Sequence, residues 1–305
     1  MLAVPALRAQ TDGVSAPLQL WILRALWLAL PFTLLDALLV ATDGAQGSTR
    51  VAVQCLFWAL WASALVVSLT PLPSTLTALR MLLPMAPAAA LCALVVGPAG
   101  TLGWLGMLAG ALAAILAMSA ATGDWFVDGA SYGDERRFCL RAPVALLLGP
   151  IELAWLLAVV PLPAGVLLFT EQIYLAAVPL ILLGIATAWW GPFALWRLAR
   201  RWVVFVPAGI TLVDDMAIAE PVLFPRRAVT RIGPAHVATE ATDLTVGAPG
   251  LVLEVDLSGP LDLAPAPRRG EPTEAVAVDS VLIVPSRPGT LLAHAETRGL
   301  VVVRD

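Results

Sequence analysis

The side chains best suited to chemistry gather in one polar segment, residues 123–137 (GDWFVDGASYGDERR), which separates two long apolar stretches. The segment holds four carboxylates, and carboxylate oxygens are the ligands that hard divalent cations such as Mg²⁺ prefer. The candidate metal ligands are therefore Asp124, Asp128, Asp134 and Glu135. We favour a second interpretation, a solvated loop in which three arginines fix the topology and contact anionic headgroups, namely Arg136, Arg137 and Arg141.

The same segment contains a literal match to the hydrolase motif GxSxG at residues 129–133 (GASYG). A serine hydrolase needs this serine on a turn between a strand and a helix, with a histidine to accept its proton and an acid to orient that histidine. The two histidines of the chain, His236 and His294, both lie far along the sequence from Ser131. We interpret the match as chance, assign no catalytic or cofactor-binding residue, expect no cofactor, and favour a non-enzyme over an enzyme.

Four ionisable residues fall inside the long apolar stretches: Asp36, Glu152, Arg24 and Arg80. A charge at membrane depth is costly, so such residues face a partner or a water-filled cavity. Asp36 is near one end of its stretch, where its side chain can reach the membrane surface. Glu152 is the stronger functional candidate. We expect it to form an ion pair with Arg24 or Arg80, and proton transport is the alternative role.

The composition places these residues in a membrane protein. Of the 305 residues, 59% are hydrophobic and 13% are charged, whereas soluble domains carry about 25% charged residues. The net charge of −4 argues against a nucleic-acid partner, because phosphate binding needs a basic surface. A helix needs about 20 apolar residues to cross the hydrocarbon core, and six stretches qualify: residues 19–41, 51–70, 75–97, 101–121, 143–163 and 174–196.

The placement of arginines predicts the orientation of these spans, because positively charged flanks stay on the cytoplasmic side. If the N-terminal tail, residues 1–18, is cytoplasmic, nearly all flanking arginines fall inside and Arg50 falls outside. The membrane bundle then covers residues 19–197, and the loop 122–142 is cytoplasmic together with both termini. We therefore expect a multi-pass protein of the bacterial plasma membrane, with the lipid bilayer as the partner of its bundle.

Small residues recur every four positions in the fourth stretch, at Gly106, Gly110 and Ala114. Such a stripe lets two helix backbones approach closely. We expect it to pack against other helices of the same chain rather than to form a dimer.

Beyond residue 198 the long apolar runs give way to short alternating ones, which predicts a β-rich domain over residues 198–305. The clearest strand is residues 251–257 (LVLEVDL), in which apolar residues occupy alternate positions. A short helix is expected over residues 288–298, with a proline near its start and Gly299 as its C-terminal cap. Further strands are expected at residues 202–206, 209–213, 221–224, 228–232 and 280–284.

Two segments of this domain, residues 200–212 (RRWVVFVPAGITL) and 228–233 (AVTRIG), resemble the opening hairpin and following strand of bacterial pleckstrin-homology-like (PH-like) domains fused to membrane helices. The resemblance implies a small, mainly-β fold with a helix near its end. The apolar tail, residues 300–303, departs from the pattern, because the domain is expected to end at that helix. The whole chain also resembles uncharacterised multi-span membrane proteins of actinobacteria, a likeness that implies no activity.

Together these features predict a bundle of about six membrane helices that presents a cytoplasmic PH-like domain to a protein partner, as a non-enzymatic scaffold or regulatory anchor. PH-like sheets often expose an edge or a groove that recognises peptides. The alternatives are a small-solute transporter and a membrane enzyme that uses the acidic segment 123–137. No inverted repeat relates the first three spans to the last three, which disfavours transport.

Overall fold

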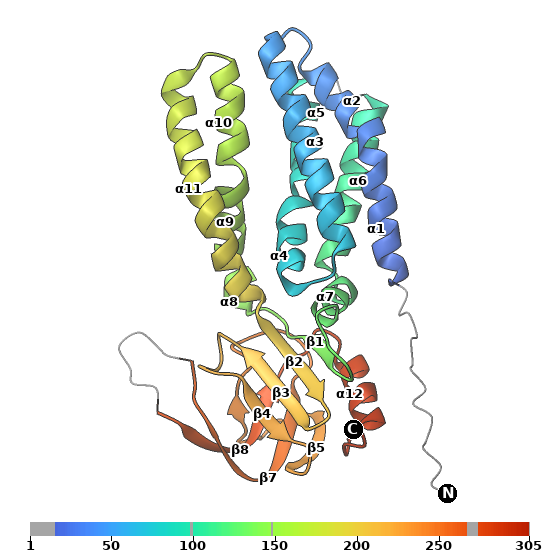
Figure 1. The fold of residues 1–305 in the computed structure, drawn as a ribbon, viewed down its shortest axis with the longest axis vertical. Coiled ribbons are helices and arrows are strands. Elements are labelled where there is room, and N and C mark those ends of the chain that lie inside the picture. The colour runs from blue at the N-terminus through green and yellow to red at the C-terminus, as the bar shows by residue number, and fades with distance from the viewer. Residues whose placement is uncertain (1–15, 98–99, 148, 267–273, 305) are drawn as a thin grey trace, which may run out of the picture.

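The computed structural model describes residues 16–97, 100–147, 149–266 and 274–304. Most of the expected N-terminal tail, residues 1–18, lies outside the described residues. Figure 1 shows two parts, an upright bundle of helices and a β-rich domain at one end of it. The described chain enters and leaves the bundle at the end nearest the β-domain, which we call the domain end. Entry and exit at the same end agree with an even number of helices that run the length of the bundle.

Six helices in the described chain are long and apolar enough to cross a membrane, which confirms the predicted number: Leu18–Ala41, Gly47–Leu69, Pro73–Val96, Thr101–Met118, Pro150–Thr170 and Tyr174–Phe193. Three are continuous, namely α3 (Gly47–Leu69), α6 (Thr101–Met118) and α11 (Tyr174–Ala199). The others are interrupted near prolines, which lack the N–H that a helix interior needs. Their segments are α1 (Leu18–Ala29), the turn η1 (Leu30–Phe32), α2 (Leu34–Ala41), α4 (Pro73–Leu82), α5 (Met85–Val96), α9 (Pro150–Val159) and α10 (Pro161–Thr170).

The fifth span lies further along the chain than residues 143–163, where we expected it. A separate short helix, α8 (Val144–Leu147), occupies the start of that range. Gly149 has a φ of +124° and turns the chain, and Pro150 takes the first helical position, where its missing N–H costs nothing. Pro161, close to the predicted end of the span at residue 163, begins α10 and lets the span continue.

The bundle consists of two groups of helices, α1 to α6 and α9 to α11 (Figure 1). In the first group the small residues of α6 pack on the interrupted helices. A Cβ atom added to Gly106 would lie 2.8 Å from the backbone nitrogen of Leu34, and Gly110 faces α5 at similarly close range. In the second group, a Cβ atom on Gly184 of α11 would lie 2.5 Å from the backbone nitrogen of Leu162 of α10. These glycines therefore bring helix backbones of one chain into contact.

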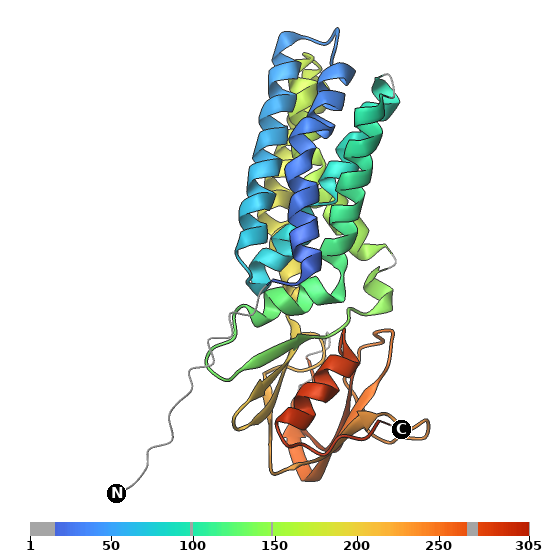
Figure 2. The ribbon, with the colours of Figure 1, turned by 90° about the vertical axis from the view of Figure 1, so that its right-hand side faces the viewer.

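The β-domain contains two four-stranded sheets and a final helix. The first sheet is antiparallel, in the order β1 (Arg136–Cys139), β2 (Arg201–Val206), β3 (Gly209–Asp214) and β4 (Val222–Pro225). The second has the order β5 (Val229–Pro234), β7 (Leu253–Leu263), β8 (Val276–Ile283) and β6 (Thr242–Asp243). Helix α12 (Pro288–Thr297) packs beside the sheets (Figure 2). Side chains from both sheets and α12 share one core, which includes Phe205, Ile232, Leu253, Val281 and Leu291.

Each strand predicted beyond residue 198 overlaps an observed strand, but the loop predicted at residues 122–142 is mostly regular structure. Helix α7 (Ala120–Asp128) lies across the domain end of the bundle (Figure 2), and β1 follows it. Strand β1 pairs with β2, with Arg136 opposite Phe205. The sequence RRFC lacks an apolar alternation, and its strand conformation depends on a partner strand far along the chain. The β-domain therefore includes a strand from the connection between two of the long apolar helices.

The apolar tail that departs from the PH-like pattern adds to the second sheet. The backbone N–H of Ile232 donates to the carbonyl of Val301 at 2.9 Å, and the N–H of Val303 donates to the carbonyl of Ile232 at 2.9 Å. The tail thus runs parallel to the edge strand β5 and satisfies its backbone groups.

Candidate functional site

Asp124 joins the bundle to the β-domain. Its side chain, on α7, is buried and 4% exposed. One carboxylate oxygen, Oδ1, accepts hydrogen bonds from the backbone N–H of Cys139 at 3.0 Å and from Ser286 Oγ at 3.1 Å. The other, Oδ2, lies 3.9 Å from Arg287 Nη1 and has no hydrogen-bond partner among the described residues. A single carboxylate therefore holds both β1 and the segment between β8 and α12.

The surroundings of Asp124 change the acid–base behaviour of two groups. Burial raises the pKa of Asp124, and the hydrogen bonds from Cys139 and Ser286 and the charge of Arg287 oppose that effect. Burial likewise raises the pKa of the Cys139 thiol to about 12, and the nearby Asp124 adds to the increase. The reactive form of cysteine is the thiolate, so Cys139 is a buried, unreactive thiol.

The remaining carboxylates of the segment 123–137 have structural partners of their own. Asp128 Oδ1 accepts hydrogen bonds from the backbone N–H of Arg137 at 2.9 Å and from Ser131 Oγ at 2.9 Å, and Oδ2 is ion-paired with Arg136. Glu135 pairs with the Arg137 side chain at 3.2 Å. The serine of the GxSxG match is therefore held by an aspartate, and among the described residues its hydroxyl group forms no hydrogen bond with a histidine.

The four candidate metal ligands do not converge. Asp124 faces the β-domain, whereas Asp128 and Glu135 bind arginines. Asp134 contributes its backbone carbonyl, which accepts a hydrogen bond from Arg298. Across the described residues, no three His, Cys, Asp or Glu side chains meet at a point where they could hold a metal ion.

The strongest ion pair at the junction is one that the sequence analysis did not identify. Arg201, 3% exposed, donates from Nε to both carboxylate oxygens of Asp214 at 2.9 Å. Its other nitrogens donate to the carbonyls of Arg141 at 2.8 Å and Thr245 at 3.2 Å. Burial raises the pKa of Asp214, and the Arg201 guanidinium opposes that effect. The Arg201 side chain thus ties β2 to the connection between β1 and α8 and to the segment after β6.

No two of the polar residues predicted within the spans are ion-paired with each other in the described part of the chain. The Arg24 guanidinium donates to the Ser68 carbonyl and stacks on the Trp21 ring at 5.0 Å. Asp36 is exposed on α2. Glu152 accepts a hydrogen bond from the backbone N–H of Gly149 at 2.8 Å and so caps its own helix.

The expected ion pair between Glu152 and Arg24 or Arg80 is absent from the described residues, because Glu152 is instead held at the positive N-terminal end of α9. Arg80 donates from Nε to the carbonyl of Ala117 at 3.2 Å, at the end of α6. Its guanidinium also lies against α7, since a Cβ atom added to Gly123 would be 2.9 Å from Arg80 Nη2. Arg80 thus links three helices at the domain end.

A groove of about 560 Å³ opens on the β-domain, and its lining includes Ala208 in the turn between β2 and β3. That turn is at the end of β2 that points away from the bundle (Figure 1). Strand β4, an edge of its sheet, forms one wall, and the tail after α12 forms another. Leu223 is 41% exposed and Val301 is 60% exposed in this groove. Arg226 and Arg227 also line it, are exposed, and have no carboxylate within 4.0 Å among the described residues.

Sequence reasoning did not find this groove. The Arg226-Arg227 pair lies in a turn that looks like any solvated turn, and the tail residues meet it only because they run beside β5. Comparison with protein-family models, with curated proteins and with solved structures finds no match for this chain.

Proposed function

We propose that the chain is a multi-pass protein of the bacterial plasma membrane that presents a PH-like domain to the cytoplasm, where the groove beside β4 binds an acidic segment of a protein partner. The observation that carries the proposal is the pairing of exposed apolar side chains, Leu223 and Val301, with two exposed arginines that lack carboxylate partners among the described residues. An extended peptide with an apolar anchor and neighbouring carboxylates complements both features.

The arrangement of the β-domain supports the PH-like assignment. Its two sheets enclose one core, and a helix follows the last strand, as the resemblance implies. Groove binding is favoured over addition of a peptide strand to β4. That strand has four residues and is flanked by Pro221 and Pro225, and short proline-bearing edges resist strand addition.

The rigid junction supports an anchoring role. Asp124, on α7 at the end of the bundle, holds β1 and the segment before α12 of the β-domain through buried polar contacts. Such contacts hold the groove at a defined orientation to the membrane. The alternatives have less support, because Asp128 and Glu135 are engaged by arginines and Glu152 caps a helix.

Site-specific photo-cross-linking in intact cells tests this function. A photoreactive amino acid replaces Leu223 in the groove or, as a control, Val237, which is fully exposed elsewhere on the domain. We expect position 223 to give a cross-link that mass spectrometry maps to an acidic segment of one partner, and position 237 to give none to that segment.

Charge reversal gives the matched comparison. We expect Arg226→Glu to lower the yield of the mapped cross-link more than about tenfold, because placing like charges together at an interface costs several kcal/mol. Arg304→Glu makes the same charge change outside the groove lining and should leave the yield unchanged. A cross-link that maps to a basic or uncharged segment, or that Arg304→Glu weakens as much as Arg226→Glu, would contradict the proposal.

A further inference from the structure

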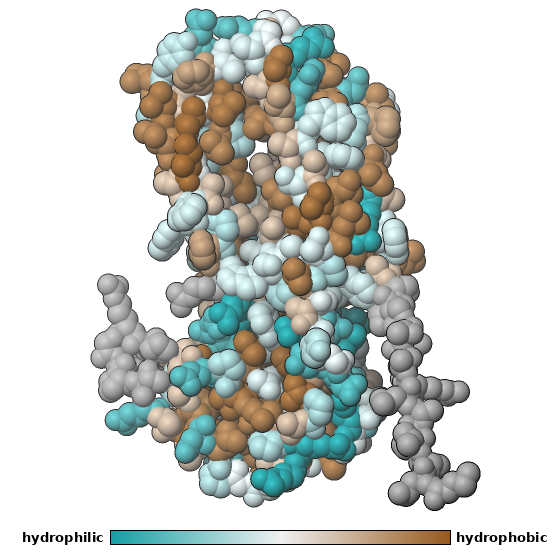
Figure 3. Space-filling model, in the orientation of Figure 1, coloured by the Kyte–Doolittle hydropathy of each residue, from teal (hydrophilic) through white to brown (hydrophobic). Residues whose placement is uncertain are grey.

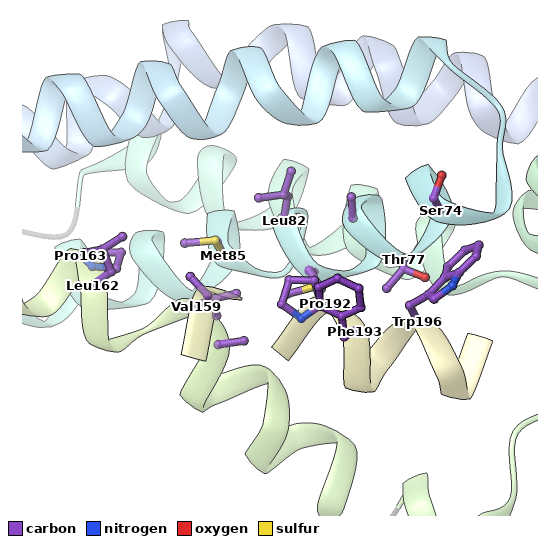
Figure 4. Close-up of a pocket in the computed structure, with 14 residues that line it drawn as sticks. Ser74, Thr77, Leu82, Met85, Val159, Leu162, Pro163, Pro192, Phe193 and Trp196 are labelled. Carbon is purple, nitrogen blue, oxygen red and sulfur yellow. The ribbon is translucent and has the colours of Figure 1, made fainter. Parts of the chain in front are cut away.

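The two groups of helices leave an apolar slot between them. A cavity of about 560 Å³ lies where α4 and α5 face α9, α10 and α11, and the surface is hollowed between the two groups (Figure 3). Figure 4 shows its walls, which include Met85, Leu162, Phe193 and Trp196. Its volume is in the range of about 300–1,000 Å³ that small-molecule sites occupy. At this depth of the bundle the surrounding solvent is hydrocarbon, so a lipid chain is the ligand that the walls fit.

A second cavity, of about 410 Å³, borders the first toward the domain end, and both are lined by Thr77 and Met81. Unlike the first cavity, the second cavity is lined by charged side chains. Arg80 and Glu152 both line it, on α4 and α9 respectively, and the two side chains are not ion-paired with each other. Its remaining walls are mainly apolar and include Trp155, whose indole N–H donates to the Met81 carbonyl at 2.8 Å.

Both charged groups retain capacity to bind a ligand. Arg80 uses Nε for the Ala117 carbonyl and has no carboxylate within 4.0 Å in the described chain. Glu152 uses Oε2 for the Gly149 N–H. The side chain of Thr77, which is 8% exposed, has a buried Oγ1 without a hydrogen-bond partner among the described residues. The walls therefore present a cation, an anion and a hydroxyl group beside an apolar slot.

We propose that this slot binds a zwitterionic phospholipid of the phosphatidylethanolamine type, with an acyl chain between the two helix groups, the phosphate at Arg80 and the ammonium group at Glu152. A guanidinium forms strong charge-assisted hydrogen bonds with phosphate oxygens, and a carboxylate does so with an ammonium group. A purely anionic headgroup would satisfy Arg80 but would bring a negative charge toward Glu152. A cation at Arg80 and an anion at Glu152 therefore favour a lipid that carries both a phosphate and an ammonium group.

Native mass spectrometry of the purified full chain, with equal amounts of phosphatidylethanolamine and phosphatidylglycerol added, tests the headgroup. We expect the chain to retain phosphatidylethanolamine in excess, and Glu152→Gln to reduce that excess about tenfold. The side-chain carbonyl of glutamine can accept the same hydrogen bond from the Gly149 N–H, so the variant keeps the start of α9. Equal retention of the two lipids, an excess of phosphatidylglycerol, or an unchanged ratio in Glu152→Gln would overturn the proposal.

A matched pair of variants on α11 tests the chain-binding slot. Ala188 lines the first cavity, whereas Ala186 lies on the same helix outside its lining, and both are exposed. We expect Ala188→Trp to fill the slot and lower retention of phosphatidylethanolamine about tenfold, and Ala186→Trp to leave it within about twofold of the unmodified chain. Equal retention by the two variants would show that the lipid binds elsewhere.

Discussion

Replacing Asp124 by alanine should release β1 from the bundle. In the folded chain this carboxylate accepts from the Cys139 N–H at 3.0 Å and from Ser286 Oγ at 3.1 Å, and its side chain is 4% exposed. Alanine removes the acceptor and leaves a buried N–H without a partner. Such a group costs about 1–3 kcal/mol, and the lost hydroxyl bond adds about 1 kcal/mol. We expect a local destabilisation of about 2–4 kcal/mol.

Hydrogen–deuterium exchange measured by mass spectrometry reports this change directly. An opening free energy lowered by about 2–4 kcal/mol speeds exchange about 30-fold to 1,000-fold. The increase should appear in peptides that cover residues 136–139 and 284–287, because these two segments meet at Asp124. Peptides from α3 should exchange as in the unmodified chain.

The control is Asp43→Ala, which removes an exposed carboxylate that pairs with Arg50 at 3.1 Å far from the junction. Exposed pairs contribute about 0–1 kcal/mol, so exchange in β1 should not change. Unchanged exchange of residues 136–139 in Asp124→Ala, or an equal change in Asp43→Ala, would refute the role given to Asp124.

The Asp124 carboxyl group should also make the free energy of unfolding depend on pH. Burial raises the pKa of Asp124 above its ordinary value near 4, so the folded chain binds this proton more tightly than the unfolded chain does. The contribution of the group to the free energy of unfolding is therefore largest below the ordinary pKa and falls as the pH rises toward the raised pKa. We expect the stability of the unmodified chain relative to Asp124→Asn to decrease as the pH rises from about 4, and a pH-independent difference would contradict this assignment.

Three further predictions concern the junction and the second helix group. Arg201→Ala should lower the free energy of unfolding by about 3–5 kcal/mol, because it leaves the Asp214 carboxylate buried and unpaired. In thermal unfolding, the double variant Arg201→Met with Asp214→Leu should regain most of that stability. Equal stability of the single and the double variant would contradict this prediction. The Cys139 thiol, whose pKa burial raises to about 12, should react with iodoacetamide at pH 8 only after unfolding, and rapid labelling of the folded chain would show that the thiol is accessible. Gly184→Ala should destabilise the α10–α11 pair by about 1–3 kcal/mol, because the alanine Cβ would lie 2.5 Å from the Leu162 backbone nitrogen. An unchanged thermal unfolding temperature would show that the two helices can move apart without a loss of stability.

Hydrophobic run length predicted the number of membrane-type helices, because a span needs a continuous apolar stretch and little else. It did not predict the limits of the fifth span. Pro161 lies close to the predicted end of that span, and a proline can either end a helix or occupy the first position of a helix segment that continues the span. Local composition cannot distinguish these two roles.

The strands after residue 198 were predictable because apolar residues alternate within them, whereas β1 was not. In the four residues of β1, Phe138 and Cys139 are adjacent and both buried, which breaks the alternation of a half-buried strand. Pairing with β2 determines its conformation. The polar connection predicted at 122–142 also contains most of helix α7, which its polar composition did not indicate.

One missed pair did leave a signal in the sequence. The hairpin of β2 and β3 turns between Val206 and Gly209, which places Arg201 directly opposite Asp214. Opposite charges at directly opposed strand positions favour pairing, so hairpin register alone could have suggested this contact. The groove had no such signal, because its walls come from β4 and from a tail that follows α12.

The most direct test of the account is the side of the membrane that the groove faces. Single-cysteine chains, made after replacing Cys55, Cys92 and Cys139, carry a thiol at Val237 on the β-domain or at Ala45 between the first two spans, both exposed positions. We predict that a membrane-impermeant maleimide labels Ala45→Cys in intact cells and labels Val237→Cys only after permeabilisation. Labelling of Val237→Cys in intact cells would contradict it, because the groove would then face away from the cytoplasm.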